Sequence, residues 1–436
     1  MTNRKAYIFP MMVISTIFFV FGFIIWLNGI LIPYFKICLE LSNFQASLVM
    51  FAAYIAYFVM ALPSAWILKY TGYKKGMVIG LSVMAFGTIL FVPAAYTRTY
   101  SMFLSGLFIT GTGLTLLQAA VNPYVAVIGP IESTAQRIGF MGLANKIAGI
   151  FSILVLGSLF LLDADSISTS ITNIDIEKKA EILDVYAQKI VIPYLFITGV
   201  LLLLAAMIHF SNLPEIDESK IETKDAKVVV KNRASVFHYP WLIFGILTMF
   251  FTIPCEVIPI DGIIIYSKAL GIPVAEAMHF PTYALAAMLI GYTASILLIP
   301  KYLSQNRALQ IVSIWGILLL IGSYFGEGMF SIYCLVLTSC GTAVLWGTIW
   351  GLSLRGLGQH TKVGGSMLLM GVVGGALWPL LFGRLIDINP HAPQNAVLML
   401  IPLYLVALVF SSWGYRLDGW SLASIKKSIF IGHEKD

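Results

Sequence analysis

The chain has 436 residues, of which 59% are hydrophobic and only 11% are charged, and its mean hydropathy is +0.89. Soluble globular domains carry about 25% charged residues, so this composition excludes a soluble protein and indicates a protein that crosses the membrane many times. The formal net charge of +6 does not indicate nucleic-acid binding, because the basic residues lie between apolar segments. The four cysteines are scattered and predict neither a disulfide framework nor a metal site.

Apolar segments of about 20 residues are long enough to cross a bilayer as helices. The first of them is too long for a cleaved signal and has no small-residue cleavage site, so we interpret it as a membrane helix. We therefore predict an all-α membrane protein with twelve transmembrane helices. The predicted spans are 8–34, 43–68, 76–95, 100–128, 138–162, 190–212, 238–267, 274–300, 307–325, 329–354, 364–387 and 394–415.

Two polar stretches interrupt this pattern. Residues 163–189 form a predicted loop between spans five and six, and residues 213–237 form a predicted linker between spans six and seven. The linker divides the chain into two six-helix halves, 1–212 and 238–436, and a basic turn follows the second span of each half. Paired six-helix halves related by pseudo-symmetry are typical of the major facilitator fold.

The distribution of basic residues predicts the orientation. Most Lys and Arg residues fall in the segments that share a side with both termini, and that side also contains the linker 213–237. Basic residues are enriched in cytoplasmic loops, so we expect both termini and the linker in the cytoplasm and the loop 163–189 outside.

One predicted helix has a polar face inside an apolar sequence. Within GTGLTLLQAAVNPYVAVIGP, Thr115, Gln118 and Asn122 are spaced so that they share a helix face. Amide side chains at membrane depth are costly without partners or water, and Pro123 weakens the helix at this point. The functional hypothesis is that this face lines a buried polar cavity, and the alternative is that it joins two helices.

Three charged residues lie within predicted spans, namely Lys146, Glu256 and Asp261. An unpaired charge at the bilayer centre costs about 2.5–3.5 kcal/mol on insertion scales, so each must be paired, hydrated or neutral. The functional hypothesis is a cation or proton site on an uptake pathway, and the alternative is an ion pair that only joins helices. The functional hypothesis is favoured for Glu256. For Asp261, nearer the outer end of its span, an exposed position is an equal alternative, and for Lys146 both explanations stand.

Helix-breaking residues surround the two acids. Pro254, Pro259 and Gly262 fall within nine residues of one span and predict a discontinuous helix. Broken helices in transporters expose backbone carbonyls that can bind ions or sugar hydroxyls. The alternative is a simple kink in a packed helix.

Four tryptophans are candidates for sugar stacking, because indole faces match pyranose rings. Trp346 and Trp350 are four residues apart on one helix face, and Trp26 and Trp378 lie in spans one and eleven. The alternative is an aromatic belt at the membrane surface, which fits Trp346 poorly because this residue is deep in its span. For Trp26 and Trp350 both explanations stand.

Signatures of soluble enzymes are missing from the sequence. The chain has no Walker loop, no dinucleotide-binding fingerprint after a strand, no HExxH and no GxSxG. We therefore expect no enzymatic activity, no cofactor and no ATP hydrolysis by this chain.

Several longer motifs, read together, resemble a known family. LNGILIPYF, LSNFQASLVM, TGYKKGMVIGL, LQAAVNPYVAVIGP and LGQHTKVGGSMLLMGVVGGALWP resemble the fucose permease branch of the major facilitator superfamily. LQ…NPYV and GPIES…NKIAG are most similar to the bacterial glucose/galactose transporters. The resemblance covers nearly the whole chain outside the two polar stretches. It implies sugar uptake across the bacterial inner membrane, and we expect the protein to act as a monomer.

The departures from this family concern the coupling residues. The family pattern has an Asp where this chain has Gly29 and a Glu where it has Gln118, and both carboxylates belong to proton and sugar handling in that family. The family often has Gln in place of Met50 and Asn in place of Lys146. Glu256 matches the acid typical of the glucose/galactose group. The resemblance therefore implies sugar transport and leaves the coupling ion open.

The sequence as a whole predicts a secondary active transporter that imports a neutral hexose, glucose or galactose, by alternating access. Its partners would be the sugar, the lipid bilayer and a coupling cation, without nucleic acid. The expected sugar contacts are Asn28, Gln118, Asn122 and Trp346, with Trp26, Trp350 and Lys146 as further candidates.

Glu256 is the first candidate for ion coupling and Asp261 the second. No resident metal is expected. Na⁺ at Glu256 is favoured over H⁺, because hard cations prefer oxygen ligands and the two usual proton-handling acids are replaced. The alternatives are an uncoupled facilitator, an H⁺-coupled symporter for fucose or another sugar, and a membrane sugar sensor.

Overall fold

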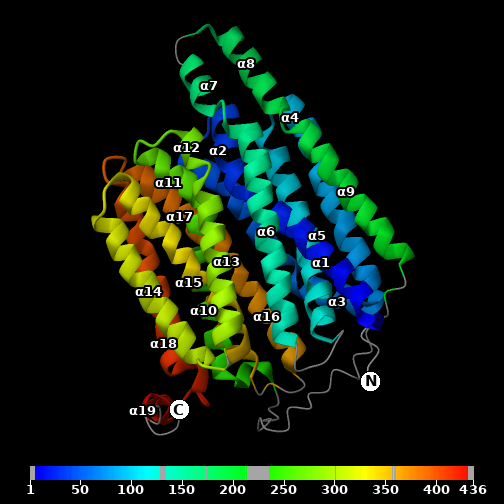
Figure 1. The fold of residues 1–436 in the computed structure, drawn as a ribbon, viewed down its shortest axis with the longest axis vertical. Coiled ribbons are helices and arrows are strands. Elements are labelled where there is room, and N and C mark those ends of the chain that lie inside the picture. The colour runs from blue at the N-terminus through cyan, green and yellow to red at the C-terminus, as the bar shows by residue number, and fades with distance from the viewer. Residues whose placement is uncertain are drawn as a thin grey trace.

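The computed structural model describes residues 5–127, 134–171, 174–211, 213, 235–299, 301–355, 357 and 360–430. Helices dominate these residues, and no β-strand occurs among them (Figure 1). The prediction of an all-α protein is confirmed. The linker 213–237 falls almost entirely outside the described residues.

The first half of the chain contributes long helices and a short helical pair at one end of the molecule. Its elements are α1 (Lys5–Ile25), α2 (Asn28–Cys38), α3 (Asn43–Ile89), α4 (Phe91–Thr97), α5 (Tyr100–Val127), α6 (Thr134–Leu161), α7 (Ala164–Ser170), α8 (Ile176–Gln188) and α9 (Val191–Phe210).

The second half repeats long helices broken by short turns of other helical types. Its elements are η3 (Val236–His238), α10 (Pro240–Val257), η4 (Ile258–Gly262), α11 (Ile263–Ala269), α12 (Val274–Ala277), α13 (Phe280–Leu298), α14 (Gln305–Phe325), α15 (Gly328–Leu354), α16 (Thr361–Met370), η6 (Gly371–Val373), α17 (Gly374–Ile388), η7 (Pro393–Met399), α18 (Leu400–Ser412), η8 (Gly414–Arg416) and α19 (Leu422–Phe430).

Eleven stretches of the described residues are long and apolar enough to cross a membrane, and one of them is long enough to contain two spans. Residues 43–97 form a stretch of 55 residues, more than twice the length of one span. Inside it Gly72 has φ 74° and ψ 175°, a left-handed conformation that glycine adopts without a Cβ clash. The chain reverses at this glycine, so spans two and three lie on either side of it and the predicted twelve-helix architecture is confirmed.

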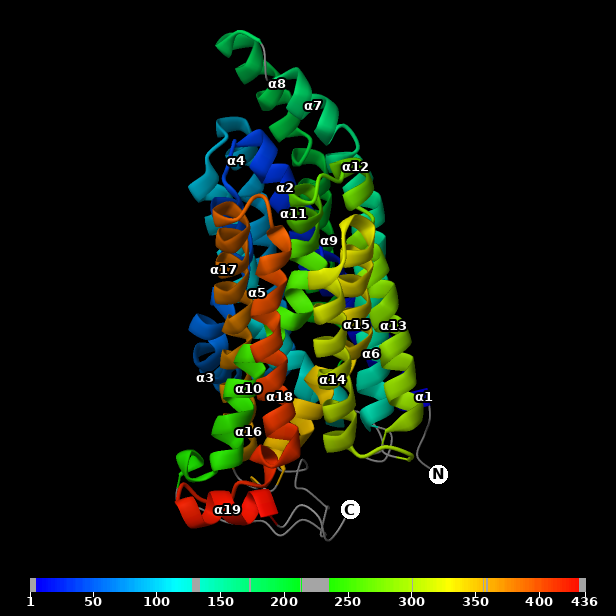
Figure 2. The ribbon, with the colours of Figure 1, turned by 90° about the vertical axis from the view of Figure 1, so that its left-hand side faces the viewer.

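The stretch 163–189 is not the loop that its polar composition predicts. It forms α7 and α8, which project from the bundle at the end opposite α19 (Figure 2). Leu183, Tyr186 and Ala187 are buried on one face of α8, with the i, i+3, i+4 spacing of an amphipathic helix. The polar residues that suggested a loop occupy the other face.

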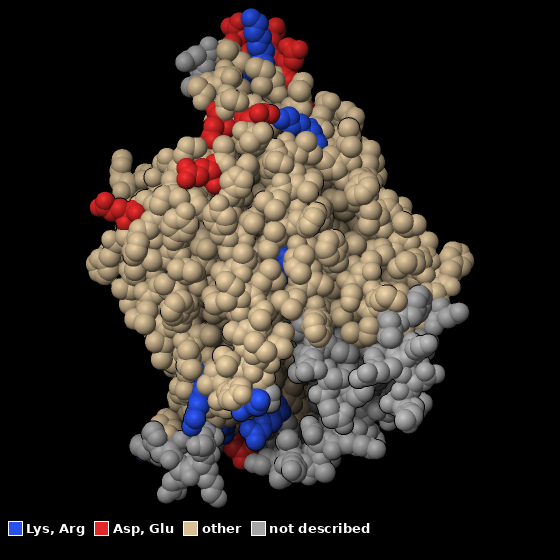
Figure 3. All heavy atoms as spheres, in the orientation of Figure 1, with Lys and Arg blue, Asp and Glu red and all other residues tan. Residues whose placement is uncertain are grey.

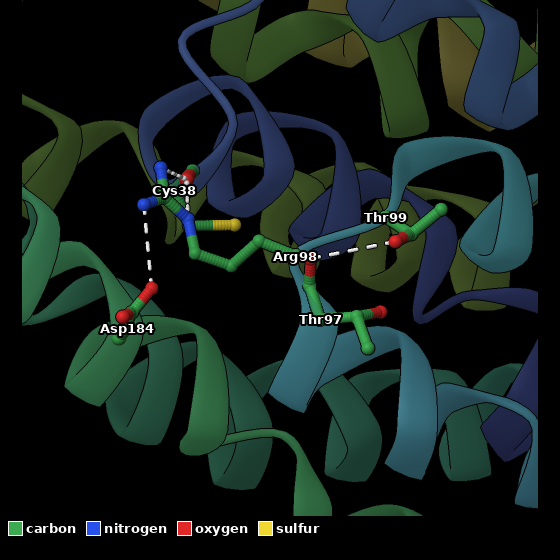
Figure 4. Close-up of polar contacts among 5 residues, drawn as sticks. All are labelled: Cys38, Thr97, Arg98, Thr99 and Asp184. Carbon is green, nitrogen blue, oxygen red and sulfur yellow. Dashed lines mark hydrogen bonds and ion pairs between the residues drawn. The ribbon is translucent and has the colours of Figure 1, made fainter.

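On the face that Figure 3 shows, charged side chains gather at the two ends of the molecule and the surface between them is nearly uncharged. At the end with α7 and α8, Arg98 joins three helices (Figure 4). Its Nε and Nη2 donate to the Cys38 carbonyl at 3.1 and 2.8 Å, and its Nη1 lies 3.3 Å from Oδ1 of Asp184. Arg98 ends α4 in a left-handed conformation with φ 46°, which turns the chain toward α5.

The two halves pack against each other along several helices. α17 packs on α3, α13 packs on α6, and α2 packs on η4 and α11. At the end with α7 and α8, Asp165 accepts a hydrogen bond from the Ala275 amide at 3.0 Å. At the same end, Asp387 accepts from the Phe44 amide at 2.9 Å and from the Asn43 side chain. These contacts join the halves at the predicted outer side.

Candidate functional site

A buried ion pair joins the two halves at membrane depth. Nζ of Lys146 on α6 lies 2.9 Å from Oε1 of Glu256 on α10, and the two side chains are only 6% and 15% exposed. The charges that would each be costly alone therefore neutralise one another. Because α6 and α10 belong to different halves, the pair can persist only in conformations that bring these helices together.

Trp26 supports the Lys146 ammonium. Nζ lies 3.8 Å from the centre of the Trp26 ring, within the range of a cation–π interaction, and 6.0 Å from the centre of the Tyr292 ring. Trp26 Nε1 donates to Oδ1 of Asn145 at 3.0 Å. The indole approaches α6 closely at Gly149, where an added Cβ would lie 2.5 Å from the Trp26 ring. Trp26 is buried and hydrogen-bonded, so it does not belong to a surface belt.

Asp261 lies in η4, a single π-helical turn between α10 and α11. Its side chain is completely buried, so the alternative of an exposed position is wrong. Neither carboxylate oxygen makes a hydrogen bond of regular geometry with the described residues, and the potential donors that face it are the Gly29 amide and the Tyr54 hydroxyl. Gly29 of α2 faces it so closely that an added Cβ would lie 3.1 Å from Oδ1.

The predicted discontinuity of span seven takes the form of this π-helical turn. α10 ends at Val257, the five residues of η4 follow, and α11 resumes the α-helix at Ile263. Pro259 has no amide hydrogen to donate, which removes one bond of the regular ladder. Single π-helical turns of this kind are frequent at functional sites.

Gln118 on α5 contacts the neighbouring helix α3. Its Nε2 donates to the Tyr57 hydroxyl at 2.9 Å, and the Tyr57 ring stacks on Tyr54 with centroids 6.2 Å apart. Thr115, predicted on the same face, bonds the Gly111 carbonyl of its own helix at 2.8 Å. In this conformation Gln118 therefore joins two helices, which is the alternative explanation of the polar face.

A small cavity lies inside the first half beside the two tyrosines. Its volume is about 40 Å³, and its polar lining includes Tyr54, Tyr57, Thr88 and Thr110. This volume admits water but is too small for a hexose. This cavity is therefore not the sugar site.

The remaining predicted sugar contacts are distributed as follows. Trp346 and Trp350 stack on each other on α15, with centroids 5.5 Å apart and planes 21° apart. Trp378 lies on α17, and its ring centre is 5.7 Å from that of Phe251. The backbones of Asn28 and Asn122 belong to α2 and α5, and their side chains are outside the described part of the structure.

The structure adds site residues that the sequence pattern did not single out. Asn145 orients Trp26, and Tyr292 flanks Lys146. From α3, Tyr54 faces the Asp261 carboxyl and Tyr57 faces the Gln118 amide. A signal for the last two was present, because FAAYIAYF places two tyrosines three residues apart in the middle of a span. Among the described residues no group of three or more His, Cys, Asp and Glu side chains could hold a metal.

Comparisons with known proteins agree with this architecture. The chain is 29% identical over 394 residues to a glucose/galactose transporter of Brucella abortus, with 88% of this chain and 90% of the relative covered. It is 28% identical over 417 residues to the L-fucose-proton symporter of Escherichia coli, with 94% and 93% covered.

Solved structures give the same result. The crystal structure of the transporter FucP in the outward conformation matches with a TM-score of 0.69 and 26% identity, and the match covers 94% of this chain and 99% of that one. Residues 14–379, most of the chain, match the Major Facilitator Superfamily. The chain therefore belongs to the Major Facilitator Superfamily of membrane transporters, and it is not an enzyme.

Proposed function

We propose that this protein imports a neutral hexose, glucose or galactose, by alternating access and couples uptake to the inward movement of a cation. The observation that carries the proposal is the buried set of Lys146, Glu256 and Trp26, which joins the two halves at membrane depth. A site shared by both halves is where an alternating-access transporter binds its substrate. The glucose/galactose transporters among its relatives support the choice of sugar.

Polar and aromatic residues predicted to line the path between the halves suit a neutral sugar. The amides of Gln118, Asn28 and Asn122 can donate to and accept from hydroxyls, and the stacked pair Trp346 and Trp350 offers an indole face. Lys146 and Glu256 have further hydrogen-bonding capacity, because the structure pairs one ammonium with one carboxylate oxygen. We propose these residues as the sugar contacts, with Trp26 acting through Lys146.

Buried acids support a coupled transporter over an uncoupled facilitator, which has no need of them. One charge moved inward gains about 2.3 kcal/mol per 100 mV, enough to concentrate a neutral solute roughly 50-fold. Na⁺ at Glu256, the ion that the sequence favours, would have to displace the Lys146 ammonium. Glu256 therefore fits a role in the sugar-binding network at least as well as a role in ion binding.

We further propose that both termini and the linker 213–237 lie in the cytoplasm, that 1–212 and 238–436 move as two bodies, and that the protein acts as a monomer in the bacterial inner membrane. The orientation is supported by the enrichment of Lys and Arg in the segments that share a side with both termini. Contacts between the halves at Asp165 and Asp387 would then form the outer side.

Transport by the purified protein in proteoliposomes tests the proposal. Vesicles loaded with unlabelled hexose should take up labelled glucose or galactose by counterflow, and a panel of competing sugars should rank these hexoses above fucose and xylose. Imposing Na⁺ and pH gradients separately identifies the ion. Counterflow of no hexose in the panel would overturn the sugar assignment, and counterflow without accumulation under either gradient would identify a facilitator.

A further inference from the structure

We propose that the coupling cation is a proton, carried by the Asp261 carboxyl in a site that Gly29 and Tyr54 of the opposite half close. This inference rests on the proposed function, since it concerns the ion that drives sugar uptake. It identifies the ion and assigns it to Asp261 rather than to Glu256.

The first argument is the state of the side chain. Asp261 is completely buried, and neither of its oxygens makes a hydrogen bond of regular geometry with the described residues, although the Gly29 amide and the Tyr54 hydroxyl face it. A lone carboxylate in such surroundings is among the most costly groups to bury, whereas a neutral carboxyl group costs much less. The next residue, Gly262, lies against the apolar side chains of Ile258 and Phe382, so the surroundings are dry on that side as well.

The second argument is the location of the site between the halves. Asp261 belongs to the second half, and its neighbours Gly29 and Tyr54 belong to α2 and α3 of the first. Tyr54 also meets Gly375 of α17, where an added Cβ would lie 2.8 Å from its ring. The carboxyl is therefore enclosed only while the halves meet here, and any motion that separates them exposes it to water.

This location links proton binding to conformation. A group that is neutral when the halves enclose it and hydrated when they part favours closure only after it has bound a proton. Opening toward the outside lets the carboxylate take a proton from water and form an O–H bond. Closure keeps that proton on the oxygen, and opening toward the inside returns it to water. One proton then crosses the membrane in each cycle in which the empty protein returns without a proton on Asp261.

The third argument concerns the charged groups that face Asp261. Glu256 of α10 and Lys146 of α6 both act on Asp261 and pair with each other at 2.9 Å, so the attraction of the lysine for Asp261 is offset by the repulsion of the glutamate. Tyr54 of α3 presents a neutral hydroxyl, and among the described side chains and backbone α2 presents the backbone of Gly29.

Those surroundings favour a proton over Na⁺. A proton needs one oxygen atom, whereas hard metal cations take several oxygen ligands. The groups that the structure places at Asp261 are the Tyr54 hydroxyl and the backbone of Gly29, and neither adds a second carboxylate to the site.

The test compares Asp261→Asn with the wild-type protein in proteoliposomes. Asparagine imitates the neutral carboxyl but cannot exchange a proton. With an inward gradient of one pH unit, no membrane potential and equal Na⁺ on both sides, a transporter moving one proton per sugar accumulates hexose up to about tenfold. We expect accumulation and proton uptake, followed with an internal pH dye, in the wild type. In Asp261→Asn we expect an inside-to-outside ratio near one, with measurable counterflow.

Two controls make the result specific. Asp184→Asn makes the same chemical change at the surface, where the side chain is 51% exposed, and should accumulate hexose normally. A reciprocal variant that combines Gly29→Asp with Asp261→Gly moves the carboxyl across the contact. Because the Cβ position of residue 29 lies 3.1 Å from Oδ1 of Asp261, we expect this variant to regain accumulation that Asp261→Asn has lost.

Three results would overturn the inference. They are proton-coupled accumulation by Asp261→Asn, accumulation by the wild type under a Na⁺ gradient alone at clamped pH, and counterflow without accumulation in the reciprocal variant. Each of them leaves hexose transport itself intact. Failure of the wild type to exchange any hexose would instead contradict the proposed function, so the two failures are distinguishable.

Discussion

The ammonium of Lys146 lies 3.8 Å above the centre of the Trp26 ring, and both residues are almost completely buried. The indole comes from span one and the lysine from span five of the same half, whereas Glu256, which neutralises the lysine, comes from the other half. The first half therefore positions the Lys146 ammonium against the Trp26 ring, and the second half supplies the Glu256 carboxylate that neutralises it. Separation of the halves would leave Lys146 with Trp26 and with water.

This arrangement predicts how the protein responds to loss of either charge. Lys146→Met or Glu256→Gln alone should destabilise the folded protein by about 3–5 kcal/mol, because each leaves one buried charge without its partner. The double variant should be markedly more stable than the sum of the single effects implies. Thermal unfolding in detergent measures the cycle.

An exposed pair in the same chain serves as the control for that cycle. Lys189 and Asp163 lie 3.1 Å apart with side chains 29% and 59% exposed, so Lys189→Met should cost about 0–1 kcal/mol. Strictly additive effects of Lys146→Met and Glu256→Gln would contradict a direct interaction between the two charges.

The proposed sugar face gives a second prediction. Gln118→Ala and Asn122→Ala should each weaken hexose binding by roughly 1–3 kcal/mol, about 5- to 150-fold, because each leaves a sugar hydroxyl without its partner. Titration of the purified protein with glucose and galactose measures the affinity. Thr115→Ala is the matched control, since its hydroxyl bonds its own helix, and it should bind sugar normally. Unchanged affinity in both amide variants would exclude this face as the binding surface.

Topology gives a third prediction. A cysteine that replaces Ile176, which is 86% exposed on α8, should react with a membrane-impermeant maleimide only from outside the cell. A cysteine within 213–237 should react only from the cytoplasmic side. Cys38, Cys255 and Cys334 are buried and Cys340 is half-buried, so labelling of the protein without the added cysteine gives the background. Reaction of both sites from the same side would contradict the division into six and six spans.

Much of the fold was predictable because apolar length is a local property. The twelve spans, the break around Pro259 and the charged candidates within spans all follow from short windows of sequence. The α8 helix was missed, because its polar composition hides a narrow apolar face. Amphipathic periodicity around Leu183 would have been the better guide.

The site was predictable only as a set of unconnected residues. Lys146 and Glu256 were each singled out, but their pairing depends on a contact between residues 110 positions apart that no local pattern encodes. The sequence shows only that Gly29 stands where the family pattern has an Asp, and its role becomes visible in the packing of α2 on η4. Its missing side chain leaves room for the carboxyl of Asp261.

The final prediction concerns Asp387, which joins the halves at the predicted outer side. Its carboxylate accepts from the Phe44 amide in the first turn of α3 and from the Asn43 side chain, and a carboxylate at a helix N-terminus is stabilised by the helix dipole. Asp387→Asn removes the charge at this contact, which should cost about 1 kcal/mol and shift the protein toward conformations open to the outside.

The position of Ser47 is suited to measure the shift toward conformations open to the outside. It is buried against Gly383 of α17, where an added Cβ would lie 2.4 Å from its hydroxyl. A cysteine at position 47 should therefore react slowly with an external maleimide, and several-fold faster when Asp387→Asn is added. Asp184→Asn, which removes a charge from the same side without separating the halves, should leave the rate unchanged. Equal rates with and without Asp387→Asn would mean that the apolar packing of α17 on α3 holds the outer side closed without help from this carboxylate.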